Sequence, residues 1–463
     1  MASGALTQLA AVGAQEKNFL SDDAKDSVFK EPVNKINNFV KSTTSMQPLG
    51  SSNWGTTTRF KIERIGDLLG SLYFVAKLPE LNRSNLIDTG TTFFVRWVDY
   101  IGNALIENVK LYIGGQLIDE QTGDFTQIYT DLYDDDWNKL CLIGLDDTLI
   151  KPSDKIDSTH IYVPLKFWFC NSLKKALPLI ALQYHDVEIE VKIRDWNSCY
   201  QVLQKINDTD KYGYVQIQES NKMKEQPLEG VRLDCNYIHL DSEERKRVAQ
   251  SEHKILITQV QQIKCSVSQG KSIELSSFNH PVKELFFYFT NNHIKNLPDP
   301  FNFSSKSEYI TKDISDNHIK TTNVIATGGR FKHYEESNKD HTLGEARLLI
   351  NGYPRIEWRD FKYYYYLQNY ENYRNKLEHY VYLYSFSGNP KSETPMGSLN
   401  FSRVDNAQLQ FTINEISREN DKKWLGSSKH NLTNDSNKTI TIYAVNYNYL
   451  IIKSGMAGLA YST

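Results

Sequence analysis

The sequence lacks the features by which many enzymes and membrane proteins are recognised. Its five cysteines stand about thirty positions apart with no CxxC pair, which excludes a dense disulfide framework and a typical zinc site. No apolar run reaches the roughly eighteen residues that a membrane span needs. Basic and acidic residues nearly balance, at 53 against 56, so a sequence-independent grip on nucleic acid is not expected. A soluble chain with reduced cysteines and no direct nucleic-acid partner is predicted.

Sequence motifs for catalysis are also missing, since GxSxG, GxxxxGK[ST] and HExxH do not occur. The acidic run Asp134, Asp135 and Asp136 lacks the glycine and final glutamate of an EF-hand, so a solvated loop is favoured over a cation site. His185 and Asp186 are adjacent and would face opposite sides of a strand, which disfavours a proton relay. No catalytic, cofactor-binding or metal site is predicted, and the chain is not expected to be an enzyme.

What the sequence does have is a strand-rich pattern, with 28 tyrosines and 21 phenylalanines. Alternation of apolar and polar residues predicts strands over residues 187–193, 214–218, 271–275, 409–413 and 438–445. Helical patterns are few and short. A helix is predicted over residues 242–250, whereas the tyrosine-rich residues 360–377 fit a helix, a strand or a loop.

An unusually apolar segment leads into the first of these strands. It contains Phe167, Trp168 and Phe169, which we expect either to plug the end of a sandwich or to contact a neighbour. Pro164 and Pro178 are predicted to lie where the chain enters or leaves a sheet, because proline cannot donate a ladder hydrogen bond.

Four pairs of segments repeat in the same order along the chain, at spacings between 210 and 237 residues. Two of these segments end at Gly114-Gly115 and Asn351-Gly352, dipeptides that favour a two-residue hairpin turn. The paired segments are 72–74 with 285–287, 109–115 with 346–352, 182–191 with 404–413, and 235–240 with 445–450. The repeat predicts that one all-β unit was duplicated, with the boundary in the charged residues 241–253.

Each half is predicted to be an eight-stranded jelly roll, because strands that are apolar on one face must bury that face against a second sheet. The fold class is therefore all-β, with two tandem jelly rolls side by side and few short helices in loops. The expected divisions are an N-terminal arm at 1–30, a first jelly roll at 31–241 and a second at 242–463.

From about residue 28 to its C-terminus, the sequence resembles the double jelly-roll major capsid proteins of nucleocytoplasmic large DNA viruses. The stretches that carry the resemblance are IGNALIENVKLYIGGQLIDEQTGDF (101–125), PLKFWFCNSLKKALPLIALQYHDVEI (164–189), FNHPVKELFF (278–287), SGNPKSETPMGSLNFSRVDNAQLQF (387–411) and NYNYLIIKSGMAGLAYST (446–463). They follow one another in the same order as in that family.

The resemblance implies a structural protein of the virion that is assembled in the host cytoplasm. Three copies would form a pseudo-hexagonal capsomer of an icosahedral shell, in contact with neighbouring capsomers and with minor capsid and penton proteins. Residues 291–340 and 418–437 would form an outward tower of loops, and the N-terminal arm would lie near minor capsid proteins and an internal membrane.

Two matters stay open at the level of sequence. A glycan-binding or hydrolytic β-sandwich is the alternative function, because fold alone does not determine function. Triplets of the form Asn-x-Ser/Thr also occur at Asn82, Asn207 and Asn400, and candidates for glycosylation are Asn302, Asn431, Asn434 and Asn437.

Overall fold

The structure is a computed structural model dominated by β-strands, and residues 40–463 form one compact unit. Within the described ranges, no helix is both long and apolar enough to cross a membrane. The described residues are 38–86, 93–133, 141–205, 212–215, 222–267, 272–291, 300–301, 303, 341–375, 377, 379–414 and 438–461.

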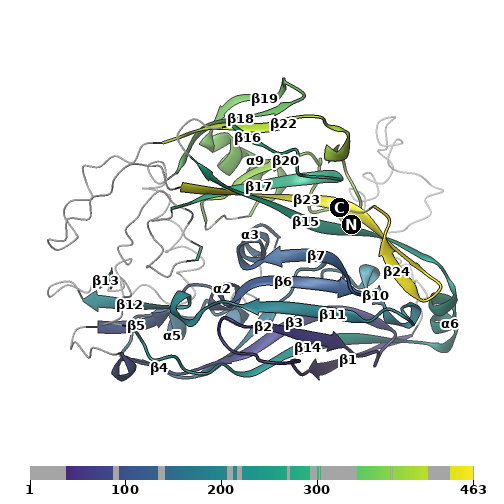
Figure 1. Ribbon diagram of the computed structural model, residues 1–463, viewed down its shortest axis with the longest axis horizontal. Coiled ribbons are helices and arrows are strands. Elements are labelled where there is room, and N and C mark those ends of the chain that lie inside the picture. Colours follow the sequence, from purple (N-terminus) through teal and green to yellow (C-terminus); the bar gives the residue numbers. More distant parts are fainter. Residues whose placement is uncertain are drawn as a thin grey trace, which may run out of the picture. The chain divides into compact units, whose positions relative to one another are not determined.

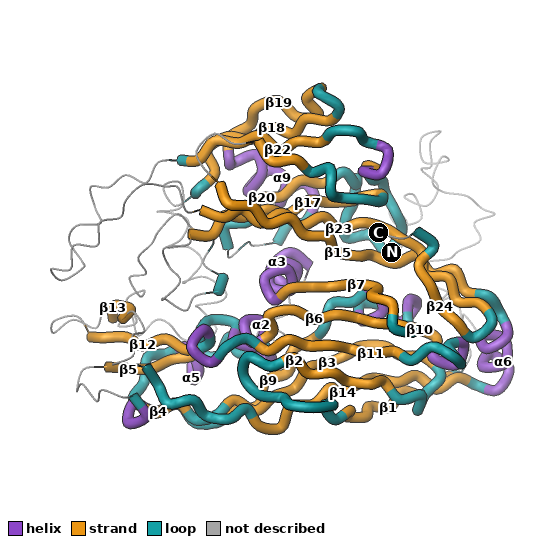
Figure 2. The backbone as a smooth tube through the Cα atoms, in the orientation of Figure 1, coloured by secondary structure: helices purple, strands orange, loops and turns teal. Residues whose placement is uncertain are grey.

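The first jelly roll contains two main sheets (Figures 1 and 2). One has the order β1 (Phe39–Met46), β14 (Glu229–Leu240), β3 (Leu68–Leu78), β10 (Leu177–Pro178), with β9 (Thr159–Pro164) also on β3. The other has the order β2 (Thr57–Ile62), β11 (Val187–Ile193), β6 (Ile106–Ile113), β7 (Gln116–Thr122). Smaller sheets join β13 (Tyr212–Val215), β12 (Tyr200–Lys205) and β5 (Phe93–Trp97), and β4 (Leu81–Asn82) with β8 (Lys155–Ile156).

The second jelly roll repeats this plan. Its first sheet has the order β15 (His253–Val267), β23 (Lys438–Lys453), β17 (Pro281–Asn291), β20 (Tyr382–Ser385), with β21 (Leu399–Asn400) on β17 and β24 (Met456–Leu459) on β23. Its second sheet has the order β16 (Ser272–Glu274), β22 (Ala407–Ile413), β18 (Leu343–Ile350), β19 (Tyr353–Asp360).

Strand order makes the two rolls equivalent element by element. The four repeated segments lie on β3 and β17, β6 and β18, β11 and β22, and β14 and β23, and each pair occupies the same place in its sheet. Two jelly rolls of one design are therefore present in the chain, as the internal repeat predicts.

The two glycine-containing dipeptides form the predicted hairpin turns, between β6 and β7 and between β18 and β19. Gly114 and Gly115 have φ angles of 60° and 80°, and Asn351 and Gly352 have φ angles of 51° and 82°. Two consecutive positive φ angles match the right-handed twist of the flanking strands, which explains why glycine and asparagine stand there.

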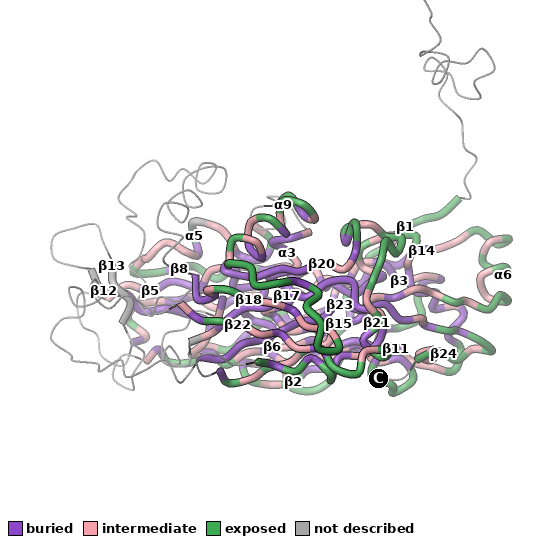
Figure 3. The backbone as a smooth tube through the Cα atoms, turned by 90° about the horizontal axis from the view of Figure 1, so that it is seen from above, coloured by how far each residue is buried: buried purple, intermediate pink, exposed green. Residues whose placement is uncertain are grey.

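Helices lie in the connections between strands. The predicted helix at 242–250 is confirmed as α6 (Ser242–Gln250), whose residues are all at least partly exposed (Figure 3). The tyrosine-rich segment is helical, with a π-helical turn η9 (Tyr363–Leu367) running into α9 (Gln368–Asn372). The other helices in the described part of the chain are α2 (Ile101–Leu105), α3 (Gly123–Tyr133), α5 (Asp147–Ile150), η2 (Arg83–Asn85), η3 (Trp168–Cys170), η4 (Leu173–Lys175), η5 (Leu179–Ala181), η6 (Trp196–Ser198) and η10 (Phe401–Arg403).

The apolar segment before β11 belongs to the core of the first roll. Phe167, Trp168 and Phe169 are all buried, so they fill the interior rather than face outward. Pro164 is the last residue of β9 and Pro178 the last of β10, which confirms that both prolines stand at strand ends.

Candidate functional site

The two rolls meet at a contact that we call the seam. It is formed by β7 and α3 of the first roll against β15, β23 and β17 of the second (Figure 1). The backbone N–H of Val260 in β15 donates to Asp119 Oδ1 in β7 at 2.9 Å, and Gln259 Nε2 donates to the carbonyl oxygen of Ile118. The second roll therefore covers β7, an edge strand that would otherwise present unpaired groups.

Two residues determine where α3 begins. Thr122 Oγ1 accepts a hydrogen bond from the backbone N–H of Phe125 at 3.2 Å and so caps the helix. A Cβ atom on Gly123 would lie 2.2 Å from the carbonyl oxygen of Ile106, so this close approach requires glycine. The Thr122 hydroxyl also lies 2.5 Å from the Tyr443 hydroxyl, which joins the start of α3 to β23.

Aromatic rings fill the space between α3 and the second roll. The buried ring of Phe125 lies 5.5 Å from that of Tyr443 and 6.4 Å from that of Phe286. Farther along α3, the rings of Tyr129 and Tyr133 stack at a centroid distance of 4.2 Å. Burial of these rings and the contacts between them stabilise the association of the two rolls.

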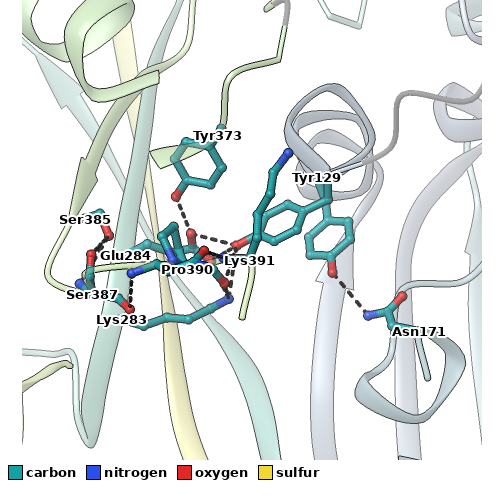
Figure 4. Close-up of polar contacts among 11 residues, drawn as sticks. Tyr129, Asn171, Lys283, Glu284, Tyr373, Ser385, Ser387, Pro390 and Lys391 are labelled. Carbon is teal, nitrogen blue, oxygen red and sulfur yellow. Dashed lines mark hydrogen bonds and ion pairs between the residues drawn. The ribbon is translucent and has the colours of Figure 1, made fainter. Parts of the chain in front are cut away.

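A buried ion pair lies at the far end of α3 (Figure 4). Lys283 Nζ is 2.9 Å from Glu284 Oε1, and only 8% and 0% of the two side chains is exposed. Tyr133 donates its hydroxyl proton to Glu284 at 2.8 Å, and Tyr373 donates to the same carboxylate. Lys283 also donates to the carbonyl oxygen of Pro390 at 3.1 Å, so both charges have several partners.

Neighbouring residues of a regular strand point to opposite faces, so this pair needs a local irregularity. Val282 pairs with Asn446 and Glu284 pairs with Val445, which leaves Lys283 as an extra residue in β17. Such a β-bulge redirects side chains. It allows Lys283 and Glu284 to meet on the face that the first roll covers.

Tyr133 and Tyr373 are held in the protonated state that they need to donate hydrogen bonds at the seam. Burial, and after it the charge of Glu284, raises the pKa of Tyr133 and that of Tyr373 well above the ordinary value. Both phenols therefore stay protonated and act as donors. The groups of this network satisfy one another, an arrangement that holds two surfaces together rather than one that receives a substrate.

Three more carboxylates contact the opposite roll. Asp124 Oδ2 accepts from the Tyr288 hydroxyl at 2.7 Å, and Asp131 Oδ2 lies 2.6 Å from His379 Nδ1. Burial raises the pKa of Asp119 to about 7, although hydrogen bonds from Val260 and other groups partly oppose the shift.

The structure gives the adjacent pair His185 and Asp186 separate partners. His185 Nδ1 accepts from the backbone N–H of Ala457 at 3.1 Å. Asp186 lies 2.7 Å from Lys61 Nζ and 3.1 Å from Arg64 Nη2, and the hydrogen bond from Lys61 holds the pKa of Asp186 below its ordinary value. The two residues serve different contacts and form no dyad.

The other residues that the sequence analysis weighed as candidate sites fall mostly outside the described residues. This holds for Asp134, Asp135, Asp136, Asn207, Asn302, Asn431, Asn434 and Asn437. Asn82 and Asn400 are described, and each caps a short helix by accepting from the backbone N–H of the serine in its own triplet, Ser84 or Ser402. Among the described residues, no group of three His, Cys, Asp or Glu side chains could hold a metal ion.

Sequence reasoning did not find the residues of the seam. Tyr133, the adjacent pair Lys283 and Glu284, and Tyr373 come from three distant parts of the chain, and no catalytic or metal-binding motif marks them. One signal was present, since Lys283 and Glu284 interrupt the apolar strand PVKELFFYF, where charges demand a buried partner.

Comparisons with known proteins agree with the architecture. A family described as large eukaryotic DNA virus major capsid protein matches residues 244–458, and one described as major capsid protein N-terminus matches residues 27–241. The major capsid proteins of Phaeocystis pouchetii virus and Paramecium bursaria Chlorella virus 1 are each 30% identical, over 99% of this chain and 100% of their own length.

Solved structures give the same result. A chain of the PBCV-1 virus capsid superimposes with a TM-score of 0.72 at 26% identity, covering 94% of this chain and 100% of that one. The Faustovirus major capsid protein, at 12% identity, shares the fold with a TM-score of 0.67 over 92% of this chain and 93% of its own. These relatives are structural proteins, which supports the shell interpretation over a glycan-binding or hydrolytic sandwich.

Proposed function

Because the chain belongs to the family of large eukaryotic DNA virus major capsid proteins and is a structural protein of the virion capsid, we propose that three copies form a pseudo-hexagonal capsomer. The observation that carries this proposal is the equivalence of the two rolls. A trimer of such chains presents six similar sandwiches and can occupy a six-fold position in a shell. The seam supports it further, since it holds the two rolls of each chain as one unit.

The proposed divisions are an arm at 1–30, a first roll at 31–241 and a second roll at 242–463. The exposed helix α6 lies between the last strand of the first roll and the first strand of the second. Such an exposed connection, through which few core contacts pass, is where a domain boundary is expected.

The capsomer would contact neighbouring capsomers and minor capsid and penton proteins, with the arm directed toward an internal membrane. Assembly would take place in the host cytoplasm. The relative in the PBCV-1 virus capsid supports assembly with other capsid subunits.

Asn302, Asn431, Asn434 and Asn437 are proposed as glycosylation positions, on the ground that they fall in long segments rich in asparagine and serine.

The native mass of the purified chain tests the trimer. Light scattering coupled to size exclusion at micromolar concentration is expected to give three times the chain mass of 53.5 kDa. A folded chain that is strictly monomeric under these conditions would contradict the proposal.

A further inference from the structure

The seam is directional, because the two rolls contribute different surfaces to it. The first roll contributes the edge strand β7 and the helix that follows it, and the second contributes the outer face of β15, β23 and β17. Since the rolls are equivalent, each also has the surface that the other uses. The second roll has its own edge strand, β19, followed by η9 and α9, and the first has its own outer face on β1, β14 and β3.

The edge strand of the second roll is exposed in the isolated chain. Only Ile356 is buried in β19, whereas β7 buries three of its seven residues. Large apolar side chains lie open along β19, η9 and α9: Tyr353 is 79% exposed, Tyr370 71%, Leu367 43% and Trp358 39%. Exposed aromatic residues clustered on an edge strand are typical of a protein contact.

The counterpart face of the first roll is also open. Arg232, Asp234 and Asn236 alternate with buried residues along β14, and the hydroxyl groups of Thr43 and Ser45 in β1 donate to Asn236 and Asp234. In the second roll, the equivalent stretch of β23 is buried on both faces. Figure 1 shows β19 and β1, the strands at which these two surfaces lie, on opposite sides of the paired rolls.

We propose that β19, η9 and α9 of one copy dock on the outer face of β1, β14 and β3 of a second copy, and so repeat the seam between chains. This inference rests on the proposed trimer and names the surfaces that build it. The contact is heterologous, and three repeats of it close a ring in which every roll meets its neighbours in the same way.

Mutation of the β19 side tests the proposal. The double variant Tyr353→Asp/Tyr370→Asp places two charges in the contact and is expected to weaken association at least ~100-fold, giving a folded monomer. Tyr184→Asp is the matched control, because Tyr184 is 74% exposed but lies beside Gly455 rather than on β19 or α9. It is expected to remain trimeric. Native mass and the near-ultraviolet circular dichroism spectrum are the readouts.

Crosslinking of the unaltered protein provides an independent measurement. In trimers mixed from isotopically light and heavy chains, an amine crosslinker should join Lys362 of one copy to Lys41 or Lys77 of another, because these exposed or half-buried lysines flank the two surfaces. Links between copies that join Lys362 to Lys362, or that leave out both surfaces, would overturn the proposal even if the double variant misfolds.

The possible outcomes distinguish a failure of the named docking surfaces from a failure of the proposed trimer. A trimeric wild type whose double variant also stays trimeric at the same concentration overturns the named surfaces and leaves the trimer standing. A monomeric wild type instead contradicts the trimer itself.

Discussion

Strands β14 and β23 hold the same place in their rolls, yet their surroundings differ. From Val231 to Tyr237, β14 alternates between buried and half-buried residues, as expected of a strand with one face on a core. In β23, every residue from Lys438 to Asn448 is buried. The difference arises because the first roll covers the outer face of β23, whereas no part of the described chain covers the outer face of β14 to the same extent.

The sequence responds to this difference one residue at a time. Asp234 pairs with Tyr73 in the first roll, and Tyr443 pairs with Phe286 at the same place in the second. Asp234 forms a half-buried ion pair with Arg232, whereas Tyr443 packs against α3. Duplication therefore preserved the pairing of strands while the outward-facing residues adapted to whatever docks on them.

Placing each of these two equivalent residues at the other's position should give the largest difference in stability between the two strands. Tyr443→Asp leaves a cavity and buries an unpaired charge, so we expect a loss of more than about 4 kcal/mol in the free energy of unfolding. Asp234→Tyr should change it by less than about 1 kcal/mol. Urea unfolding at concentrations where the wild type is monomeric measures both, and equal losses would show that the two faces are not different.

Replacement of the buried Glu284 should lower the free energy of unfolding by nearly as much as Tyr443→Asp. Glu284→Ala removes the acceptor of Tyr133, Tyr373 and Lys283 and leaves a buried cation, at an expected cost of about 3–5 kcal/mol. The control is Ser71→Ala, since Ser71 stands at the equivalent position of β3 and makes one 3.3 Å hydrogen bond. Its removal should cost ~1 kcal/mol. A Glu284 variant as stable as the Ser71 variant would contradict the role of the network.

One contribution to the pH dependence of stability should come from Asp119, in the first roll at the seam. Asp119 and Ile356 hold equivalent places in β7 and β19, but only Asp119 titrates. Its pKa is about 7 in the folded chain and about 4 when unfolded, so its contribution favours folding at low pH and is lost as pH rises from about 4 to about 7.

Asp119→Asn should flatten this part of the stability curve, by a few kcal/mol at most. Unfolding measured across that pH range checks it, with the Glu120→Gln variant as the neighbouring control. An unchanged curve in the Asp119 variant would show that this carboxyl does not carry the dependence.

Cleavage between the rolls should have the smallest effect. Limited proteolysis within α6, which has no buried residues, is expected to leave both fragments in one peak on a sizing column. The seam, rather than the connection, holds the rolls together, and an intact loop adds only a modest entropic advantage. Fragments that separate would show that the seam is too weak for this role.

Much of the fold could be predicted from the sequence, for local physical reasons. Alternation identified β11 and β22 because each has one apolar face, and paired turn residues identified two hairpins because few residues adopt positive φ. The segment around Tyr363 remained ambiguous, because tyrosine suits several structures and tertiary contacts decide among them.

The seam could not be predicted in the same way. Its ion pair depends on a bulge at Lys283, and a bulge leaves no periodic trace in the sequence. The contact of Phe125 with Tyr443 joins residues more than three hundred positions apart. Only the docking of two finished rolls brings such residues together, so their role emerges at the level of packing.

A reconstruction of the purified trimer by electron cryo-microscopy tests the central claim most directly. The account predicts six similar lobes around the three-fold axis, with β19 of each copy against β1 and β14 of the next. A trimer that leaves β19 and α9 facing solvent, or one whose two rolls are unlike in their contacts, would contradict it.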